Sequence, residues 1–250
     1  MQPASMPLVS VVQMPYLSLA NHLESAISSV EPGTRIPSEH QLAATHGVHR
    51  LTARAALQEL ERRYLVRRVQ GSGTFVTERI EYRVGADSLP SFSETVSQAG
   101  ARPRSQTESV RSRRPPAAIR DDLGLQPDER VWLVSRLRFV DDELVGCADT
   151  YVSQRLAPDL SRHLSAAGPG ASLYAAFTDG YDLAPARAGY RVEVEIASEA
   201  VSGRLRLKGR PWMIATRGRN DDAHSGRPLE VTLGFLRADV FRIVMEFDAR

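Results

Sequence analysis

Two pairs of arginines have spacings that could bring both guanidinium groups of a pair onto one ligand. Arg50 and Arg54 are four residues apart in a stretch with helical periodicity, so they share one helix face. Near a helix N-terminus, such a pair suits the bases and phosphates of DNA. Arg136 and Arg138 are two apart in an alternating stretch, so they share one strand face. That pair suits a phosphate, phosphonate, sulfonate or carboxylate. The ordinary alternatives are a solvated helix face and a salt-bridged strand face.

Local signals place the first pair at the start of a helix. Ser38 and Gln41 form the S-x-x-Q pattern of a capping box, which predicts a helix beginning there. Gly47 can end that helix, because glycine adopts the left-handed cap conformation without steric cost. A second helix is expected from near Arg50. Its apolar residues recur at the i, i+3, i+4, i+7 and i+11 positions, at Ala53, Ala56, Leu57, Leu60 and Tyr64.

A hairpin is expected directly after these helices. β-branched and aromatic residues flank Gly71-Ser72-Gly73, which is typical of two strands joined by a glycine turn. A glycine tip lets the backbone approach a phosphate or a minor groove closely. Each signal alone is weak. Their succession predicts a winged helix-turn-helix, in which one helix enters the DNA major groove.

The charge of this stretch agrees with a nucleic-acid partner. The net charge of the whole chain, +2, is too small to indicate one. Between residues 50 and 68, however, six arginines face only Glu59 and Glu61. A local basic patch of this kind attracts phosphates through counterion release.

The amino-terminal segment resembles the GntR family of bacterial transcription regulators. The matching residues are Pro32-Gly33, Pro37-Ser38-Glu39, Leu42-Ala43, Gly47-Val48, Arg50, Thr52, Arg54, Ala56-Leu57, Leu60-Glu61 and residues 70–76. The resemblance implies that Arg50 and Arg54 lie on the recognition helix, with Gly71 at the wing tip in the minor groove. The DNA-contacting positions that it implies are Ser38, His40, Arg50, Thr52, Arg54, Gly71 and Gly73.

Three residues depart from the family pattern. His49 stands where Ser or Thr usually caps the recognition helix, Leu51 where a small polar residue is frequent, and Tyr64 where Gly often ends the helix. We expect these departures to affect the operator sequence and not the fold.

The sequence pattern changes after residues 78–88, which we expect to be a linker. This segment contains Gly85 and is followed by Pro90, and both residue types interrupt regular structure. Strands that pair around short turns, such as the one at Asp141-Asp142, then mix with short helices, which predicts antiparallel sheet and an α+β class. Helices are expected at residues 91–98, 115–123, 172–178 and 198–207. Strands are expected at residues 106–113, 131–140, 144–152, 188–197, 211–219 and 229–235, with a polar loop at 220–227.

The second segment resembles the ligand-sensing UTRA domain of the HutC subfamily of GntR regulators, an antiparallel α+β domain of chorismate lyase type. The matching residues are 91–94, Ala99-Gly100, 113–116, 123–125, 136–139, Tyr151, 172–174 and 226–230. In the family the effector's acidic groups lie against the arginines and the 91–93 loop, and Glu230 takes a hydroxyl or amine. The effector-binding residues so implied are Ser91, Phe92, Ser93, Arg136, Arg138, Thr150, Ser172, Tyr174 and Glu230.

The domain organisation expected from these matches has four parts. They are a variable extension at 1–14, the winged helix-turn-helix at 15–77, a linker at 78–88 and a ligand-sensing and dimerisation domain at 89–250. General similarity, notably residues 48–54, points to a regulator of phosphonate or phosphate operons.

Other chemistries have weak support. The sequence has no run of eighteen apolar residues, no secretory signal in residues 1–14 and a single cysteine, which suits a reducing cytoplasm. The six histidines lack metal-ligand spacing, and no phosphate-binding P-loop motif occurs, so we expect neither metal nor cofactor. The alternative to a regulator is an enzyme or small-molecule binder using the lyase-like domain, which would have no need of a DNA-binding head.

The sequence thus predicts a cytoplasmic homodimer without enzymatic activity that binds pseudo-palindromic operator DNA. It would act as a repressor, and a small anionic effector of the phosphonate, phosphate, sulfonate or sugar-phosphate class would lower its operator affinity.

Overall fold

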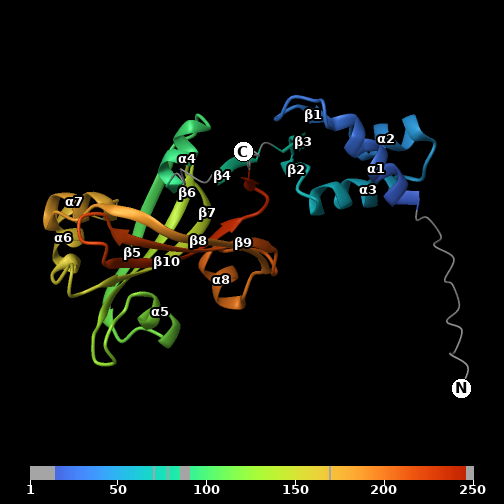
Figure 1. Ribbon diagram of the computed structural model, residues 1–250. Coiled ribbons are helices and arrows are strands. Elements are labelled where there is room, and N and C mark those ends of the chain that lie inside the picture. The colour runs from blue at the N-terminus through green and yellow to red at the C-terminus, as the bar shows by residue number, and fades with distance from the viewer. Residues whose placement is uncertain (1–14, 70, 78, 85–90, 169, 246–250) are drawn as a thin grey trace, which may run out of the picture. The chain divides into compact units, whose positions relative to one another are not determined.

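The computed structural model describes residues 15–69, 71–77, 79–84, 91–168 and 170–245 (Figure 1). The chain divides into two compact units, Met1–Glu78 and Arg79–Arg250. The extension expected at residues 1–14 lies outside the described residues, as does part of the linker expected at 78–88. The described part of that linker is a strand of the second unit.

The first unit combines helices with a small antiparallel sheet of strand order β1-β3-β2. Its elements are α1 (Pro15–Ile27), β1 (Arg35–Ile36), α2 (Glu39–His46), α3 (Arg50–Arg62), β2 (Val66–Val69) and β3 (Gly73–Val76). Leu23 of α1, Leu42 of α2 and Leu57 of α3 meet in one core, and Val66 and Val76 close it from the hairpin. This is the predicted winged helix-turn-helix.

The ends of α2 and α3 follow local chemistry. The Ser38 side chain and Gln41 make both bonds of the predicted capping box, and Gly47 ends α2 in the left-handed conformation with φ 62°. His49 caps α3, because its Nδ1 accepts the Leu51 N–H at 3.2 Å. The prediction that the helical stripe continues to Tyr64 is wrong. The helix ends at Arg62 and Tyr64 has φ 57°, a conformation that disfavours helix continuation.

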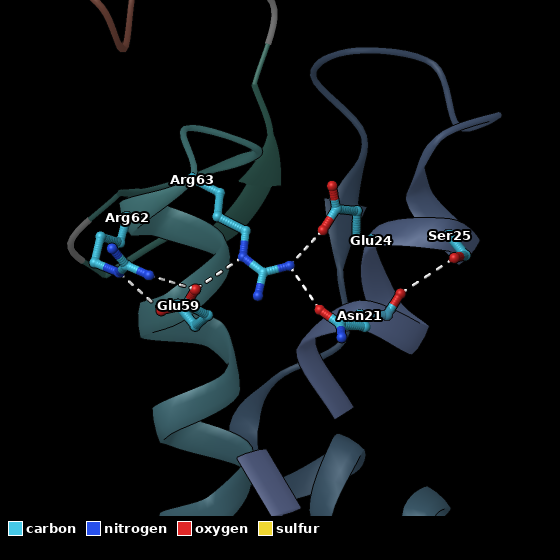
Figure 2. Close-up of polar contacts among 6 residues, drawn as sticks. All are labelled: Asn21, Glu24, Ser25, Glu59, Arg62 and Arg63. Carbon is cyan, nitrogen blue, oxygen red and sulfur yellow. Dashed lines mark hydrogen bonds and ion pairs between the residues drawn. The ribbon is translucent and has the colours of Figure 1, made fainter. Parts of the chain in front are cut away.

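A charged network ties α1 to the end of α3 (Figure 2). The Arg63 guanidinium donates to Glu59 at 2.8 Å and, across the helices, to Glu24 at 2.5 Å and Asn21 at 2.8 Å. Arg62 donates to the same Glu59 carboxylate through Nε at 2.8 Å and Nη2 at 2.7 Å. These bonds lower the pKa of Glu59 to about 2, with Arg62 the largest cause. The buried carboxylate therefore stays ionised and fixes the packing of α1 on α3.

The second unit is built on a six-stranded antiparallel sheet of strand order β5-β6-β7-β10-β9-β8. Its strands are β4 (Ile80–Val84), β5 (Pro103–Arg113), β6 (Val131–Val140), β7 (Glu143–Ser153), β8 (Pro185–Ile196), β9 (Trp212–Asp222), β10 (Pro228–Arg237) and β11 (Phe241–Met245). Its helices are α4 (Phe92–Gln98), α5 (Ala117–Asp122), α6 (Leu160–Ala167), α7 (Leu173–Tyr181) and α8 (Glu199–Arg204). The α+β class is confirmed.

Helices cover both faces of the large sheet. Ile119 of α5 packs on Val131 and Val231, and Leu205, the C-cap residue of α8, packs on Met213, so α5 and α8 lie on one face (Figure 1). The other face carries α6 and α7, whose apolar residues pack on Val134 and Val152. The remaining part of that second face holds the pocket described below.

Several element boundaries differ from those predicted. Strand β9 continues to Asp222, so the loop expected at 220–227 is shorter. Asp222 tightens it by accepting the N–H groups of Ala184 and Ser225, both at 3.0 Å. Helix α6 and strand β11 were not predicted. Strand β11 pairs in parallel with β4, Phe241 lying opposite Ile80, and nothing local in the sequence indicates that pairing.

Candidate DNA-binding surface and effector pocket

The arginine pair of α3 is exposed and lies beside an acidic residue of α2. The Arg50 and Arg54 side chains are 68% and 56% exposed. The Glu39 carboxylate is 3.7 Å from Arg50 Nε, 3.9 Å from Arg54 Nε and 3.5 Å from Arg68 Nη1. Arg68 comes from β2, so arginines of two elements, α3 and β2, converge on one carboxylate of α2. A DNA phosphate approaching this surface would compete with Glu39 for the same guanidinium groups.

The remaining residues expected at DNA lie around this cluster. Ser38 uses its hydroxyl within the capping box of α2, His40 is exposed on the first turn of that helix, and Thr52 is half-buried in α3. The structure thus places all three in or beside the two helices of the motif.

The two glycines of the hairpin have different surroundings. Gly71 is exposed, with φ 76° and open space where a side chain would begin. At Gly73, with φ 133°, a Cβ atom would lie 2.7 Å from Arg35 Nε. The Arg35 side chain could move aside, so it is the positive φ of Gly73 that favours glycine there. Gly71 is exposed and has open space beside it for a ligand.

The second unit holds a pocket with a volume of about 410 Å³ on the sheet face that also carries α6 and α7. All residues expected at the effector line it except Thr150. Thr150 lies fully buried beneath, and its Oγ1 accepts from Arg136 Nη2 at 3.4 Å and bonds to Thr232 Oγ1 at 2.9 Å. Thr150 thus positions a lining residue and does not itself line the pocket.

The two pocket arginines have few partners. The Arg136 side chain is buried, and its Nε has no hydrogen-bond partner among the described residues. Arg138 has its guanidinium 4.7 Å above the Phe92 ring and donates only a long bond, 3.5 Å, to Ser105. Burial, together with the Arg136 charge, lowers the pKa of Arg138 to about 10, so Arg138 remains cationic near neutral pH. Burial also lowers the pKa of Arg136, and the nearby Glu230 charge opposes that shift. No carboxylate of the described chain forms a salt bridge with either.

An acidic residue lies near these arginines. Glu230 is 3% exposed, and its Oε1 accepts from Asn220 Nδ2 at 2.6 Å, while Oε2 has no hydrogen-bond partner in the described structure. Asn220 also donates to the Tyr174 hydroxyl at 2.5 Å. Burial raises the pKa of Glu230, partly offset by the Arg136 charge. The pocket therefore offers cationic donors and an acidic acceptor within one cavity.

Two helix starts form part of the rim. Ser91 caps α4, accepting from the Glu94 N–H at 3.2 Å, while Phe92 and Ser93 continue the lining. Ser172 caps α7 in the same way, accepting from the Ala175 N–H at 3.2 Å. Both serine hydroxyls thus have structural roles at the positions where the sequence predicted ligand contacts.

The sequence did not reveal the part of the pocket formed by β4 and β8. Tyr82 and Tyr190 stack with their rings 6.4 Å apart, and Arg187 lies 5.2 Å from the Tyr190 ring centre. All three line the pocket. Alternation within β8 could have placed Tyr190 on one face, but only the strand order shows that this face is the pocket face.

Among the described residues, no group of three His, Cys, Asp or Glu side chains could hold a metal ion. Within the same residues, no helix is both long enough and apolar enough to cross a membrane.

Sequence comparison accounts for both units. Residues 15–76 match the bacterial regulatory proteins of the gntR family, and residues 98–242 match the UTRA domain. This chain belongs to the GntR family and carries a UTRA domain. The regulator GgaR of Escherichia coli K12 is 27% identical over 234 residues, covering 92% of this chain and 90% of GgaR. The mannosyl-D-glycerate transport/metabolism system repressor MngR of E. coli K12 is 30% identical over 149 residues, covering 58% of this chain and 61% of MngR.

Solved structures agree with the fold of this GntR protein. PhnF from Mycobacterium smegmatis superposes with a TM-score of 0.63 at 21% identity, covering 92% of this chain and 99% of PhnF. YydK from Bacillus subtilis gives a TM-score of 0.56 at 17% identity, covering 94% of this chain and all of YydK.

The comparisons confirm the class of function predicted from the sequence. The chain is a DNA-binding transcription regulator with a ligand-binding UTRA domain, and its relatives are regulators and not enzymes.

Proposed function

We propose that this regulator is a repressor that binds a pseudo-palindromic operator as a homodimer and releases it when a small anion occupies the UTRA pocket. Two-fold symmetry of a helix-turn-helix dimer matches two half-sites on the DNA. Because its target is bacterial chromosomal DNA, we infer that it acts in the cytoplasm. The naming of MngR as a repressor supports the same direction of control.

We infer the class of the effector from the arginine pair of the pocket. A buried cation is costly unless it is paired, and Arg136 and Arg138 make no salt bridge within the described chain. A phosphate, phosphonate, sulfonate or carboxylate would supply the missing charge and accept several N–H groups at once. Glu230 would then accept from a hydroxyl or amine of the same ligand.

Control of DNA binding requires that the effector distinguish two states of the protein. An anion that binds equally well to the DNA-bound and the DNA-free form cannot shift their equilibrium. We infer that the operator-releasing form brings the pocket arginines closer to the ligand. The operator in turn must weaken effector binding by the same factor, because coupling is reciprocal.

The test combines a thermal-shift screen with a gel shift. Phosphate, methylphosphonate, 2-aminoethylphosphonate, ethanesulfonate and glucose 6-phosphate are tried one at a time. We expect at least one to raise the melting temperature and, at the same concentration, to release a promoter fragment from near the protein's own gene. If the protein bound none of these promoter fragments more tightly than unrelated DNA, with an affinity that depends on salt, the proposal that it binds an operator would be contradicted. If only neutral sugars released the promoter fragment, the proposal that the effector is an anion would be contradicted.

A further inference from the structure

A third arginine reaches the pocket from β8, whereas Arg136 and Arg138 reach it from β6. The Arg187 guanidinium lies 5.2 Å from the centre of the Tyr190 ring, and it makes no hydrogen bond or ion pair with the described residues. An exposed arginine is ordinary by itself. The strands beneath Arg187 show that this side chain lies across the floor of the pocket.

Gly218 of β9 leaves the space that this guanidinium occupies. A Cβ atom on Gly218 would collide with Arg187 Nη1, so a side chain there would displace the guanidinium. Gly218 does not have a positive φ, so its backbone conformation does not call for glycine. A glycine within a strand often marks a close approach by another group. Here that group is Arg187, which extends inward from β8 over the neighbouring strand.

The pairing of the strands gives the separation of the two cationic ends of the pocket. Thr150 of β7, Thr232 of β10 and Gly218 of β9 lie directly opposite one another in a single row. Arg136 Nη2 is 3.4 Å from Thr150 Oγ1 at one end of this row, and Arg187 lies over Gly218 at the other. Two strand spacings, about 10 Å, separate these ends. A single phosphate group with hydrogen bonds of about 2.9 Å on both sides spans less than this distance.

The charges that line the pocket also leave room for a second acidic group. Arg104 has its own partner, because its Nε lies 3.6 Å from the Asp142 carboxylate. The arginine pair of β6 and Arg187 have no such partner, and Glu230 is the acidic residue among the described lining residues. Asn220 of β9 lies between Glu230 and Arg187 in the strand pairing. Three cations against one carboxylate leave two positive charges for a ligand to balance.

We propose that the effector carries two separate acidic groups and that Arg187 binds the second of them. The first group lies against the arginine pair of β6, the body of the ligand crosses Thr232, and the second group lies against Arg187 above Gly218. A guanidinium can donate two parallel N–H groups to a carboxylate or a phosphate. The inference rests on the proposed function, because it concerns the same pocket, and it narrows the effector from anions in general to compounds with two acids.

Calorimetric titration of the full chain with three pairs of phosphonates tests the second acid. The pairs are phosphonoacetate, 3-phosphonopropionate and 4-phosphonobutyrate, each compared with its carboxamide. A carboxamide has the shape of the carboxylate without its charge, and the three lengths vary the separation of the two groups. We expect at least one carboxylate to bind about tenfold or more tightly than its carboxamide, because only the carboxylate makes a fully charge-assisted contact with Arg187.

Arg187→Met assigns this advantage to one side chain, because methionine keeps much of the length and removes the charge. We expect the ratio of the two affinities within the best pair to fall towards one. Arg191→Met is the matched control on the same strand. Its register partner Arg217 binds Asp122 of α5, so Arg191 lies on the opposite face of the sheet from the pocket. The control should keep the full ratio.

Equal affinities within all three pairs would overturn the proposal, as would a ratio that Arg187→Met leaves unchanged. Release of the promoter fragment in a gel shift is measured with the same six compounds. If carboxylates and carboxamides released it equally well, the proposed function would stand and the second acid would be removed from it. If none of the six bound or released the fragment, the anionic effector itself would be contradicted, and the second acid with it.

Discussion

Glu39 occupies the centre of the basic surface that the first unit offers to DNA. Its carboxylate is within 4 Å of arginines from α3 and β2, so it is the internal counter-ion of the surface in the absence of DNA. The four-residue spacing of Arg50 and Arg54 was enough to predict their common face. The position of Glu39 beside these arginines was not predictable. It depends on how α2 packs against α3, and residue spacing within either helix does not determine that packing.

At the residue scale, Arg54→Ala should weaken operator binding by about 1–3 kcal/mol if its guanidinium contacts a base. A competition gel shift with operator and scrambled DNA measures both the loss and its sequence dependence. Arg111→Ala, exposed on the second unit, is the control and should bind as the unmodified chain does. Unchanged binding of the Arg54 variant would remove this residue from the DNA contact.

The Glu59 network predicts a pH dependence of stability. The pKa of Glu59 is about 2 in the folded protein and near its ordinary value of 4.5 when unfolded. A lowered pKa contributes stability above the unfolded value, and that contribution falls as pH drops from about 4.5 towards 2. Urea unfolding of Glu59→Gln should therefore show a large loss of stability at pH 7 and a smaller one at pH 3. Equal losses of stability at pH 7 and pH 3 would contradict the ion pairs of Glu59 with Arg62 and Arg63.

At the scale of elements, the sequence predicted best what is encoded within a few residues. The capping box predicted at Ser38 is present, the helix expected at residues 91–98 starts after Ser91, and Asp141 and Asp142 form the expected turn with φ 46° and 70°. Two positive φ values suit a two-residue hairpin loop. Strand ends were less predictable, because a strand continues as long as its neighbour offers partners. Strand β9 thus runs on to Asp222 beside β8 and β10, and β11 exists only because β4 pairs with it.

The cap of α3 gives a prediction about the recognition helix itself. His49 accepts one N–H through Nδ1, whereas Ser is a stronger N-cap residue. We expect His49→Ser to keep or slightly raise the free energy of unfolding and His49→Ala to lower it by less than the roughly 1 kcal/mol that loss of a Ser cap costs. Urea titrations at neutral pH compare the variants with the unmodified chain. A destabilised Ser variant would show that the imidazole has another structural role.

At the scale of the whole molecule, the pocket depends on the order of strands. Arg136 and Arg138 were predictable as a pair from alternation within β6. Arg187 and Tyr190 reach the same cavity from β8, which is separated from β6 by three strands of the sheet. A sequence read along the chain shows which residues share a face of one strand, but not which strands become neighbours.

The separation of the chain into two units predicts that sensing and DNA binding can be uncoupled. Arg138→Ala removes a pocket cation and changes nothing in the first unit. We expect unchanged operator affinity in a gel shift, with loss of the release caused by the anion found in the thermal-shift screen. Arg111→Ala should keep both properties. Normal release by the Arg138 variant would remove this arginine from the effector site.

The pairing of β4 with β11 has a consequence for how the protein is made. Glu81 and Arg242, joined by an ion pair across these strands, are 161 positions apart in the chain. A ribosome that has released the DNA-binding head and β4 must still synthesise the entire large sheet before β4 meets its partner. The strand that follows the head can take its place only after the large sheet and β11 have been synthesised. All residues of the DNA-binding head are thus synthesised well before the ligand-sensing domain can be completed.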